Sequence, residues 1–219
     1  MTFSLIGRCA RTGQFGAAVS TSNIAVGSRV PFCAPQVGAV LTQHRTDPRL
    51  GPRGIELLRS GCSARETIEA LVASTPHSGW RQLAVIDRAG RTAFHHGALV
   101  KPELAGAEAR DCVAIGNILA SDEVPAAMAA AFAADPEPPL AERLLRGLEA
   151  GLAAGGEHGE VMSAALLVVE REVFPLVDLR IDSQIRPIAA LRALWTEYLP
   201  WLDEFVIRAV DPDRGKGVA

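Results

Sequence analysis

Lysine is almost absent from this chain of 219 residues, which contains only Lys101 and Lys216. Arginine therefore carries nearly all of the positive charge, and 22 basic residues stand against 25 acidic ones, for a net charge of −3. Proteins that bind nucleic acid or anionic membranes through electrostatic attraction normally carry a basic excess. The charge balance excludes that class of binding, and we expect no nucleic-acid partner.

Long hydrophobic runs are lacking as well. The longest apolar stretches, such as 124–134, are too short for a membrane span, which needs about 20 residues. The first residues do not form a secretory signal, because Arg8 interrupts the apolar run. We therefore expect a cytoplasmic protein without a membrane partner.

Metal-binding patterns are also missing. The four cysteines have no Cys-x-x-Cys spacing, which favours free, mostly buried thiols in a reducing compartment. His95 and His96 are adjacent, so on a strand their side chains would point to opposite faces and could not easily share one ion. We predict no metal and no cofactor. A cysteine-dependent or metal-dependent enzyme remains an interpretation that residue spacing supports weakly.

The hydrophobic pattern predicts an alternation of strands and helix pairs within one domain. Strands are expected at 2–9, 15–22, 37–43, 81–87, 91–97, 112–117, 163–170 and 174–182. Helices are expected at 51–60, from 63 onward behind a Ser-x-x-Glu capping box, at 122–134, at 140–154, and from 187 onward with an interruption at Pro200. This order favours an α/β (α+β) protein built as a four-layer α/β/β/α sandwich, with a two-layer α+β fold as the alternative.

We divide the chain into a domain at 1–186, a helical segment at 187–210 and a disordered tail at 211–219. The helical segment contains Trp195, Tyr198, Trp201 and Phe205. Because aromatic side chains are enriched in contact surfaces, this segment is predicted to pack on the domain or on a partner subunit.

Thr2 is the first candidate for chemistry, because it follows Met1 directly and starts the first predicted strand. Removal of Met1 would place a hydroxyl and a free α-amine on one residue. An α-amine has a pKa of about 7.7–8.0 and can act as a base for that hydroxyl near neutral pH. The alternative is that Thr2 only begins an edge strand.

Several segments together resemble one protein family. They are "MTFSLIGRC", "RTGQFGAAVSTS", "AVGSRVPF", "GAVLTQ", "GPRGIELLRSG", "RQLAVID", "LAERLLRGLEAG", "SAALLVV" and "VDLRID". The chain resembles the DUF1028 family, a branch of the N-terminal-nucleophile (Ntn) hydrolase superfamily. The resemblance implies the four-layer sandwich, a homodimer or higher oligomer, and Thr2 as nucleophile, but it supplies no substrate.

The resemblance carries the rest of the site over only in part. It implies that the end of the second strand, with Ser20, Thr21 and Ser22, faces Thr2, and Ser20 and Ser22 are taken as substrate-binding candidates. Proteasome-like relatives place an acidic residue and a lysine in this region, whereas this chain has Ser20 and, near the lysine position, Arg29. That departure argues against proteasome-type peptide cleavage. Asp182 is a further substrate-binding candidate, although no acidic cluster follows it.

Asn117 ends a buried strand in the sequence "GN" and is predicted to be catalytic. An amide donor at a sheet edge can stabilise an oxyanion, a contribution worth about 3–4 kcal/mol. The alternative is a turn asparagine that satisfies its own backbone.

The sequence leaves two functions open. The first is an Ntn-type amidohydrolase that cleaves a small amide, lactam or N-acyl compound with Thr2 as nucleophile. The second is a catalytically silent protein of the same fold that binds a small ligand or serves assembly. The missing lysine near Arg29 favours the second function, and a retained Met1 would enforce it by locking the amine of Thr2 in a peptide bond.

Overall fold

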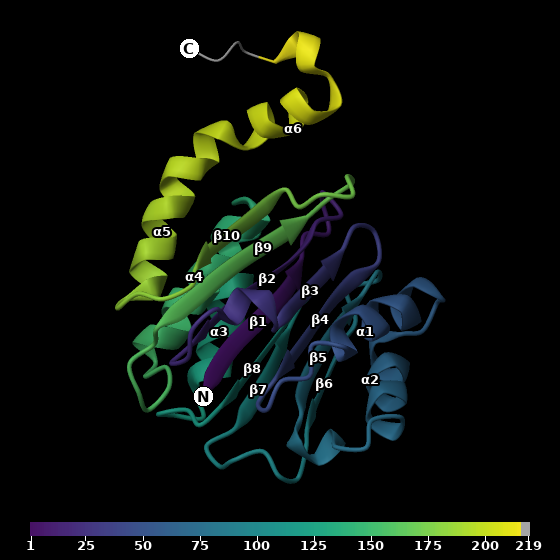
Figure 1. Ribbon diagram of the computed structural model, residues 1–219, viewed down its shortest axis with the longest axis vertical. Coiled ribbons are helices and arrows are strands. Elements are labelled where there is room, and N and C mark those ends of the chain that lie inside the picture. Colours follow the sequence, from purple (N-terminus) through teal and green to yellow (C-terminus); the bar gives the residue numbers. More distant parts are fainter. Residues whose placement is uncertain (216–219) are drawn as a thin grey trace.

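The computed structural model describes residues 1–215, which form two antiparallel sheets and six α-helices (Figure 1). The larger sheet has six strands in the order β10-β9-β2-β1-β8-β7. Their bounds are β1 Thr2–Arg8, β2 Phe15–Thr21, β7 Ala105–Ala109, β8 Cys112–Asn117, β9 Ser163–Val169 and β10 Val177–Ile181. The first strand of the chain thus lies inside the sheet, between β2 and β8.

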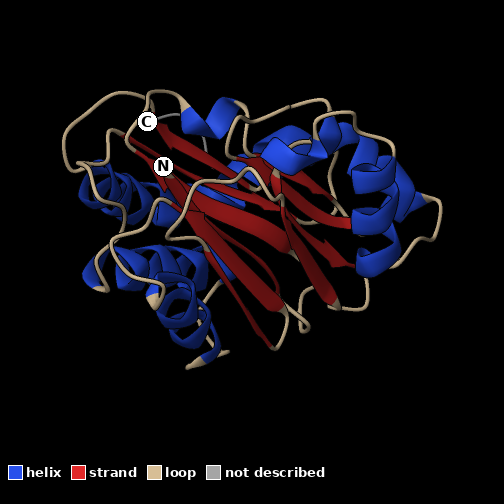
Figure 2. Ribbon diagram, turned by 90° about the horizontal axis from the view of Figure 1, so that it is seen from below, coloured by secondary structure: helices blue, strands red, loops and turns tan. Residues whose placement is uncertain are grey.

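The smaller sheet has four strands in the order β3-β4-β5-β6. Their bounds are β3 Pro31–Ala34, β4 Gly38–Gln43, β5 Gln82–Asp87 and β6 Thr92–His96. Figure 2 shows the strands lying between two groups of helices. The helices are α1 Leu50–Arg59, α2 Ala64–Ala73, α3 Val124–Ala133, α4 Leu140–Ala153, α5 Pro187–Tyr198 and α6 Leu202–Val210.

Successive side chains of β1 point to opposite faces of the larger sheet and join two different hydrophobic clusters. Phe3 and Leu5 point toward α3 and α4 and join the cluster that contains Met128 and Leu144. Ile6 points the other way and packs between the two sheets. A third cluster joins the smaller sheet to α1 and α2. Because opposite faces of one strand serve two clusters, each residue of β1 has its direction fixed by its position.

Most predicted elements are confirmed, and the predicted capping box forms between Ser63 and Glu66 at the start of α2. Two strands escape prediction from the sequence. Neither β3 nor β7 has a counterpart among the expected strands. No helix within residues 1–215 has the length and apolarity needed to cross a bilayer.

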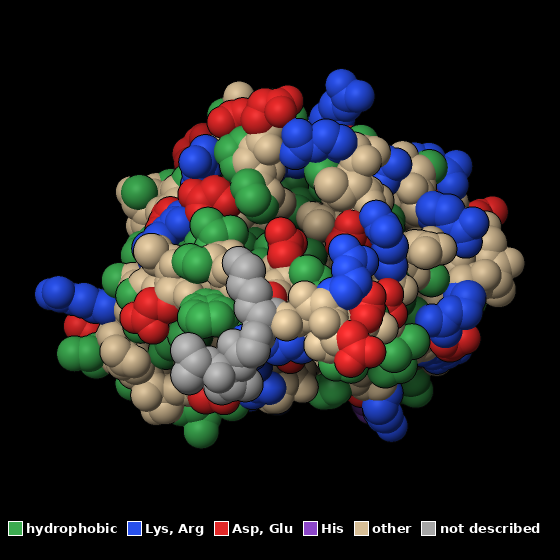
Figure 3. All heavy atoms as spheres, turned by 90° about the horizontal axis from the view of Figure 1, so that it is seen from above, with side chains coloured by type: hydrophobic (Ala, Val, Ile, Leu, Met, Phe, Trp, Pro, Cys, Tyr) green, Lys and Arg blue, Asp and Glu red, His purple; other side chains and the backbone are tan. Residues whose placement is uncertain are grey.

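The C-terminal segment extends from the larger sheet. Helix α5 packs on β9 and β10 through Leu191 and Trp195, and Arg192 forms ion pairs with Glu142 and Glu149 of α4. Helix α6 lies farther out (Figure 1), and this end of the molecule presents hydrophobic side chains among charged ones (Figure 3). A short 3-10 turn follows at Pro212–Arg214. Residues 216–219 of the predicted disordered tail lie outside the described part of the chain.

Candidate functional site

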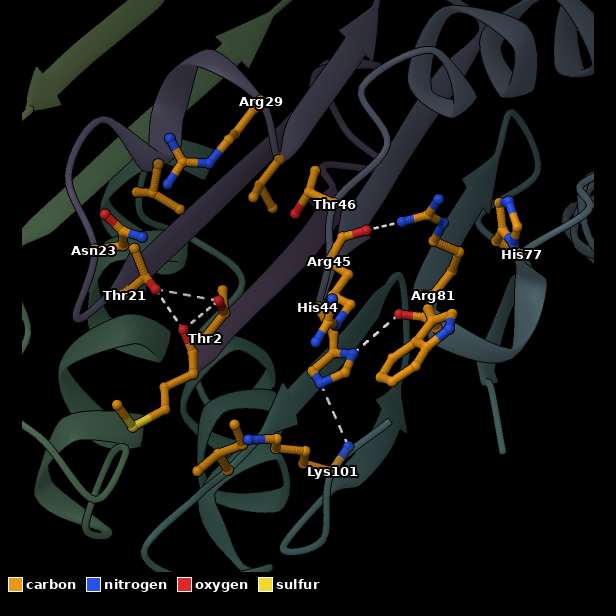
Figure 4. Close-up of a pocket in the computed structure, with 15 residues that line it drawn as sticks. Thr2, Thr21, Asn23, Arg29, His44, Arg45, Thr46, His77, Arg81 and Lys101 are labelled. Carbon is orange, nitrogen blue, oxygen red and sulfur yellow. Dashed lines mark hydrogen bonds between the residues drawn. The ribbon is translucent and has the colours of Figure 1, made fainter. Parts of the chain in front are cut away.

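A cavity of about 740 Å³ opens where β1 begins (Figure 4). Its lining comes from segments far apart in the chain: Met1 and Thr2, the end of β2 and the segment after it (Thr21, Asn23, Val26, Arg29, Val30), the loop after β4 (His44, Arg45, Thr46), the segment before β5 (His77, Trp80, Arg81), the loop before β7 (Lys101), and Ile118 after β8. A volume of this size suits a small-molecule ligand.

Thr2 belongs to a row of three polar residues at the ends of three neighbouring strands of the larger sheet, β2, β1 and β8. Pairing of β1 with β8 places Asn117 opposite Thr2, and pairing with β2 brings Thr21 to its other side. Residues opposite one another in antiparallel strands share a face of the sheet. The row therefore points toward the space between the two sheets, where the cavity lies.

The hydroxyls of Thr2 and Thr21 contact each other. Their Oγ1 atoms are 3.2 Å apart, and both hydroxyls donate to the backbone carbonyl of Met1. Thr2 is buried, whereas Met1 is 39% exposed. A reactive hydroxyl would thus lie at the cavity wall, directly behind the residue whose removal would free its amine.

Asn117 belongs to a buried network rather than to the cavity lining. Its Nδ2 donates to Oε1 of Gln82 over 2.9 Å, and Nε2 of Gln43 donates to the same oxygen over 2.6 Å. Gln82 in turn donates to the carbonyl of Gly116, and Ser4 donates to Gln43. The network holds Asn117, one member of the row, through its hydrogen bond to Gln82. The predicted oxyanion role of Asn117 stays a prediction.

The other predicted site residues are distributed unevenly. Arg29 lines the cavity, and its guanidinium donates to the carbonyls of Ile24 and Ala25. Ser20 points to the opposite face of β2 and donates to the carbonyl of Ser163. Ser22 follows β2 and does not line the cavity.

Asp182 also lies away from the cavity. Its side chain pairs with Arg180 over 2.9 Å, while its backbone carbonyl accepts from the N–H of Ala25. Through that backbone contact Asp182 anchors the segment that carries Val26 and Arg29 into the cavity wall.

Lys101 reaches the cavity from the loop between β6 and β7, and sequence reasoning missed it (Figure 4). The pKa of the N-terminal amine is lowered mainly by burial and further by the charge of Lys101, while Glu157 opposes both effects. The sequence has Arg29 near the position where a lysine would be expected by analogy with proteasome-like proteins. The fold instead brings one of the two lysines to the site from a distant loop.

Glu157 is the second residue that sequence reasoning missed. It lies between α4 and β9, is buried, and makes no side-chain hydrogen bond of normal geometry within residues 1–215. Burial raises the pKa of its carboxyl to about 7, against the opposing influence of the N-terminal amine and of the N–H of Ser22. Glu157 is thus a carboxyl group that interacts with the amine of Met1 and changes its own charge near neutral pH.

Replacing the carboxyl of Glu157 is expected to stabilise the folded protein more at high pH than at low pH. Because the pKa of Glu157 is higher in the folded protein than its ordinary value of 4.5, folding binds a proton between pH 4.5 and about 7, and stability falls as pH rises through that range. Glu157→Gln removes this dependence. We expect its stability relative to the parent protein to be greater at pH 8.5 than at pH 5 by about 2 kcal/mol, measured by urea unfolding. Glu160→Gln, an exposed change in the same loop, should show no such difference; an equal pH trend in both variants would contradict the assignment.

Strained backbone conformations gather around the cavity. His44, Arg45 and Ile118 line it and have positive φ angles of 51°, 39° and 53°, and Ala25 before Val26 has one of 54°. Positive φ is costly for residues with a Cβ, above all for a β-branched one such as Ile118. Such strain persists where the surrounding structure enforces it, and it marks this cavity as the candidate functional site.

No group of three or more His, Cys, Asp or Glu side chains within residues 1–215 is arranged to hold a metal ion. The four cysteines are free thiols. Burial raises the pKa of both Cys33 and Cys112 far above the ordinary value, which keeps these thiols protonated and poorly nucleophilic.

Two antiparallel sheets with helices packed against them make this a mixed α+β protein. The family model described as "Family of unknown function (DUF1028)" matches residues 2–191. The chain belongs to this DUF1028 family.

The solved structures that are similar to the chain include the following two. The crystal structure of protein SPO2555 from Silicibacter pomeroyi, a DUF1028 protein, is 29% identical over 90% of this chain and 85% of that one, with a TM-score of 0.84. Anbu, the ancestral beta-subunit from Yersinia bercovieri, is 11% identical over 99% of both chains, with a TM-score of 0.37. No curated protein matches the chain.

Proposed function

We propose that the protein is an Ntn-type amidohydrolase that cleaves a small amide, lactam or N-acyl compound with Thr2 as its nucleophile. The observation that carries the proposal is the hydroxyl of Thr2 at the wall of a small-molecule cavity, one peptide bond from the chain start and in contact with Thr21. The strained backbone at His44, Arg45 and Ile118 supports a functional role for the same cavity.

The reaction would start with removal of Met1, which leaves Thr2 with a free α-amine. That amine takes the hydroxyl proton while Oγ1 attacks the amide carbon, giving a tetrahedral oxyanion. The amine then returns the proton to the leaving nitrogen as the C–N bond breaks and an ester to Thr2 remains. Water, deprotonated by the same amine, hydrolyses this ester and releases the acid. At the same cavity, the pKa of the Met1 amine is lowered by burial and by the charge of Lys101, against the opposing charge of Glu157. The amine of Thr2 would need a similar shift to act as a base near neutral pH.

The oxyanion needs a hydrogen-bond donor near Thr2. The hydroxyl of Thr21 lines the cavity and is the donor that the geometry favours. Asn117 is enclosed, and its Nδ2 already donates to Gln82. We therefore assign Asn117 first to holding the row in place, and its direct contact with an oxyanion would require rearrangement of the network.

The same proposal includes the finer fold class, a four-layer α/β/β/α sandwich of the Ntn-hydrolase type. Three hydrophobic clusters support it: one between helices and the larger sheet, one between the sheets, and one between the smaller sheet and its helices. The homodimer or higher oligomer implied by the sequence resemblance stays a prediction.

The test begins with the intact mass of the protein purified from its native host. We expect loss of Met1, followed by a single covalent adduct on Thr2 when the protein meets a β-lactone, an electrophile that acylates N-terminal threonine. Protein that retains Met1 is the matched control and should remain unmodified. Retention of Met1 in the native host would rule out catalysis by Thr2 and would leave ligand binding or assembly as the function.

A further inference from the structure

The cavity beside Thr2 is strongly cationic in a chain whose net charge is negative. Arg29, Arg45, Arg81 and Lys101 all line it, and no Asp or Glu is among its described lining residues. Charged residues elsewhere are commonly balanced, as in the pairs Arg8–Asp111 and Arg192–Glu142. The cavity therefore concentrates uncompensated positive charge.

Within residues 1–215, three of the four cavity cations lack an acidic partner. Arg29, Arg45 and Lys101 form no ion pair with an Asp or Glu anywhere in residues 1–215. Arg81 makes a long ion pair of 3.8 Å with Asp47, and Asp47 pairs more closely, at 2.8 Å, with Arg49. The contacts that Arg29 makes are with backbone carbonyls, and Arg45 stacks over the ring of Trp80 with its Cζ 4.3 Å from the ring centroid. Hydrogen-bonding capacity thus remains for a ligand.

Three positive groups of the cavity act on one side chain, His44. The charges of the N-terminal amine, Arg45 and Lys101 all lower the pKa of His44, in addition to burial. Like charges held together raise the free energy of the empty site, and a bound anion would relieve that repulsion. In a cleft the field of several cations also raises the local concentration of anionic ligands.

The remaining lining is apolar. Val26, Val30, Ile118 and the ring of Trp80 offer surface for a hydrophobic group beside the cations. This combination fits an amphipathic small molecule with one charged end and one apolar end.

We propose that the amide cleaved by Thr2 carries an anionic group, a carboxylate or a phosphate, which Arg29, Arg45 and Lys101 bind while the apolar part lies along Val30 and Trp80. An N-acyl amino acid has this chemistry. The inference rests on the proposed function for the reaction but on the cationic lining alone for binding.

The test measures binding without turnover, using the full-length Thr2→Ala variant. Hippurate, its uncharged counterpart hippuramide, and inorganic phosphate are titrated by calorimetry at low and high NaCl. We expect hippurate to bind at least about tenfold more tightly than hippuramide, because hydrogen bonds to charged groups are worth about 1.5–3 kcal/mol. The affinity should fall with salt, and phosphate should compete.

Variants locate the site. Arg29→Gln and Lys101→Gln are each expected to weaken hippurate binding about tenfold or more, whereas Arg88→Gln, an exposed change on the turn between β5 and β6, should leave it unchanged. Phosphate binding that follows the same variants while hippurate does not bind would assign the site to phosphorylated substrates. Equal affinity for hippurate and hippuramide, no binding of either anion, or indifference to both cavity variants would overturn the inference.

The outcome is separable from that of the proposed reaction. Anion binding in Thr2→Ala together with an unreactive Thr2 in the processed protein would retain the anion site and reject the nucleophile. Reaction of Thr2 with neutral amides, without preference for charged ones, would do the reverse.

Discussion

Replacing Thr2 by alanine is expected to abolish turnover of the substrate amide, with a loss of at least about 10³-fold in kcat/KM, because the attacking oxygen is removed. Thr2→Ser should keep measurable activity, since it retains both a hydroxyl and a residue small enough for Met1 removal. The rate is measured on the processed protein with an N-acyl substrate, and intact mass confirms loss of Met1 in each variant.

The rates can be compared only if Thr2→Ala and Thr2→Ser are as stably folded as the parent protein. Thr2 contributes one hydroxyl contact with Thr21 and one with the Met1 carbonyl, so Thr2→Ala should change the unfolding midpoint little. Full activity of Thr2→Ala would reject the nucleophile, and activity lost in the serine variant but kept in the alanine variant would do so as well.

The second large effect is expected from Gln82, at the centre of the buried network. Gln82→Ala removes the acceptor of Nδ2 of Asn117 and the Gln82 contacts with the Gly116 carbonyl and the His96 ring. Nε2 of Gln43 loses the same acceptor and keeps only a 3.5 Å contact with the Thr2 carbonyl. Each buried polar group without a partner costs about 1–3 kcal/mol, so we expect a loss of roughly 3–5 kcal/mol in the free energy of unfolding.

Chemical denaturation at constant pH checks this value, with Gln184→Ala as the matched control. Gln184 is exposed, and its backbone N–H, which truncation of the side chain leaves in place, donates to the carbonyl of Met162. Its truncation should therefore change the free energy of unfolding by no more than about 0.5 kcal/mol. An equally small change for Gln82→Ala would mean that the network does not support the row that contains Thr2.

Local patterns in the sequence predicted most of the fold. Strands with apolar alternation and helices with clear caps could be recognised because their signals lie within a few residues. The two missed strands, β3 and β7, both form sheet edges. The first begins with a proline and the second is the alanine- and glycine-rich segment AGAEA, so neither has the β-branched composition typical of strands.

The candidate site was predictable only near Thr2. Arg29 follows β2 closely in sequence, and the structure places it in the cavity. The sequence places Ser20, Thr21 and Ser22 together at the end of β2 but does not fix the register of that strand. Because a shift of one residue moves a side chain to the other face of a sheet, only the structure separates Thr21 from its two neighbours. Lys101 and Glu157 had no local signal, since tertiary folding alone brings their loops toward the N-terminus.

The central position of β1 has a consequence for the timing of Met1 removal. In the folded protein, hydroxyls of Thr2 and Thr21 hold the Met1 carbonyl, and β8 pairs with β1 up to Thr2 itself. During synthesis, however, β8 emerges roughly 6–20 s after β1 at ordinary rates of translation. We expect an aminopeptidase to act in that interval, on an extended nascent chain, so that exposure of Thr2 would precede completion of the larger sheet.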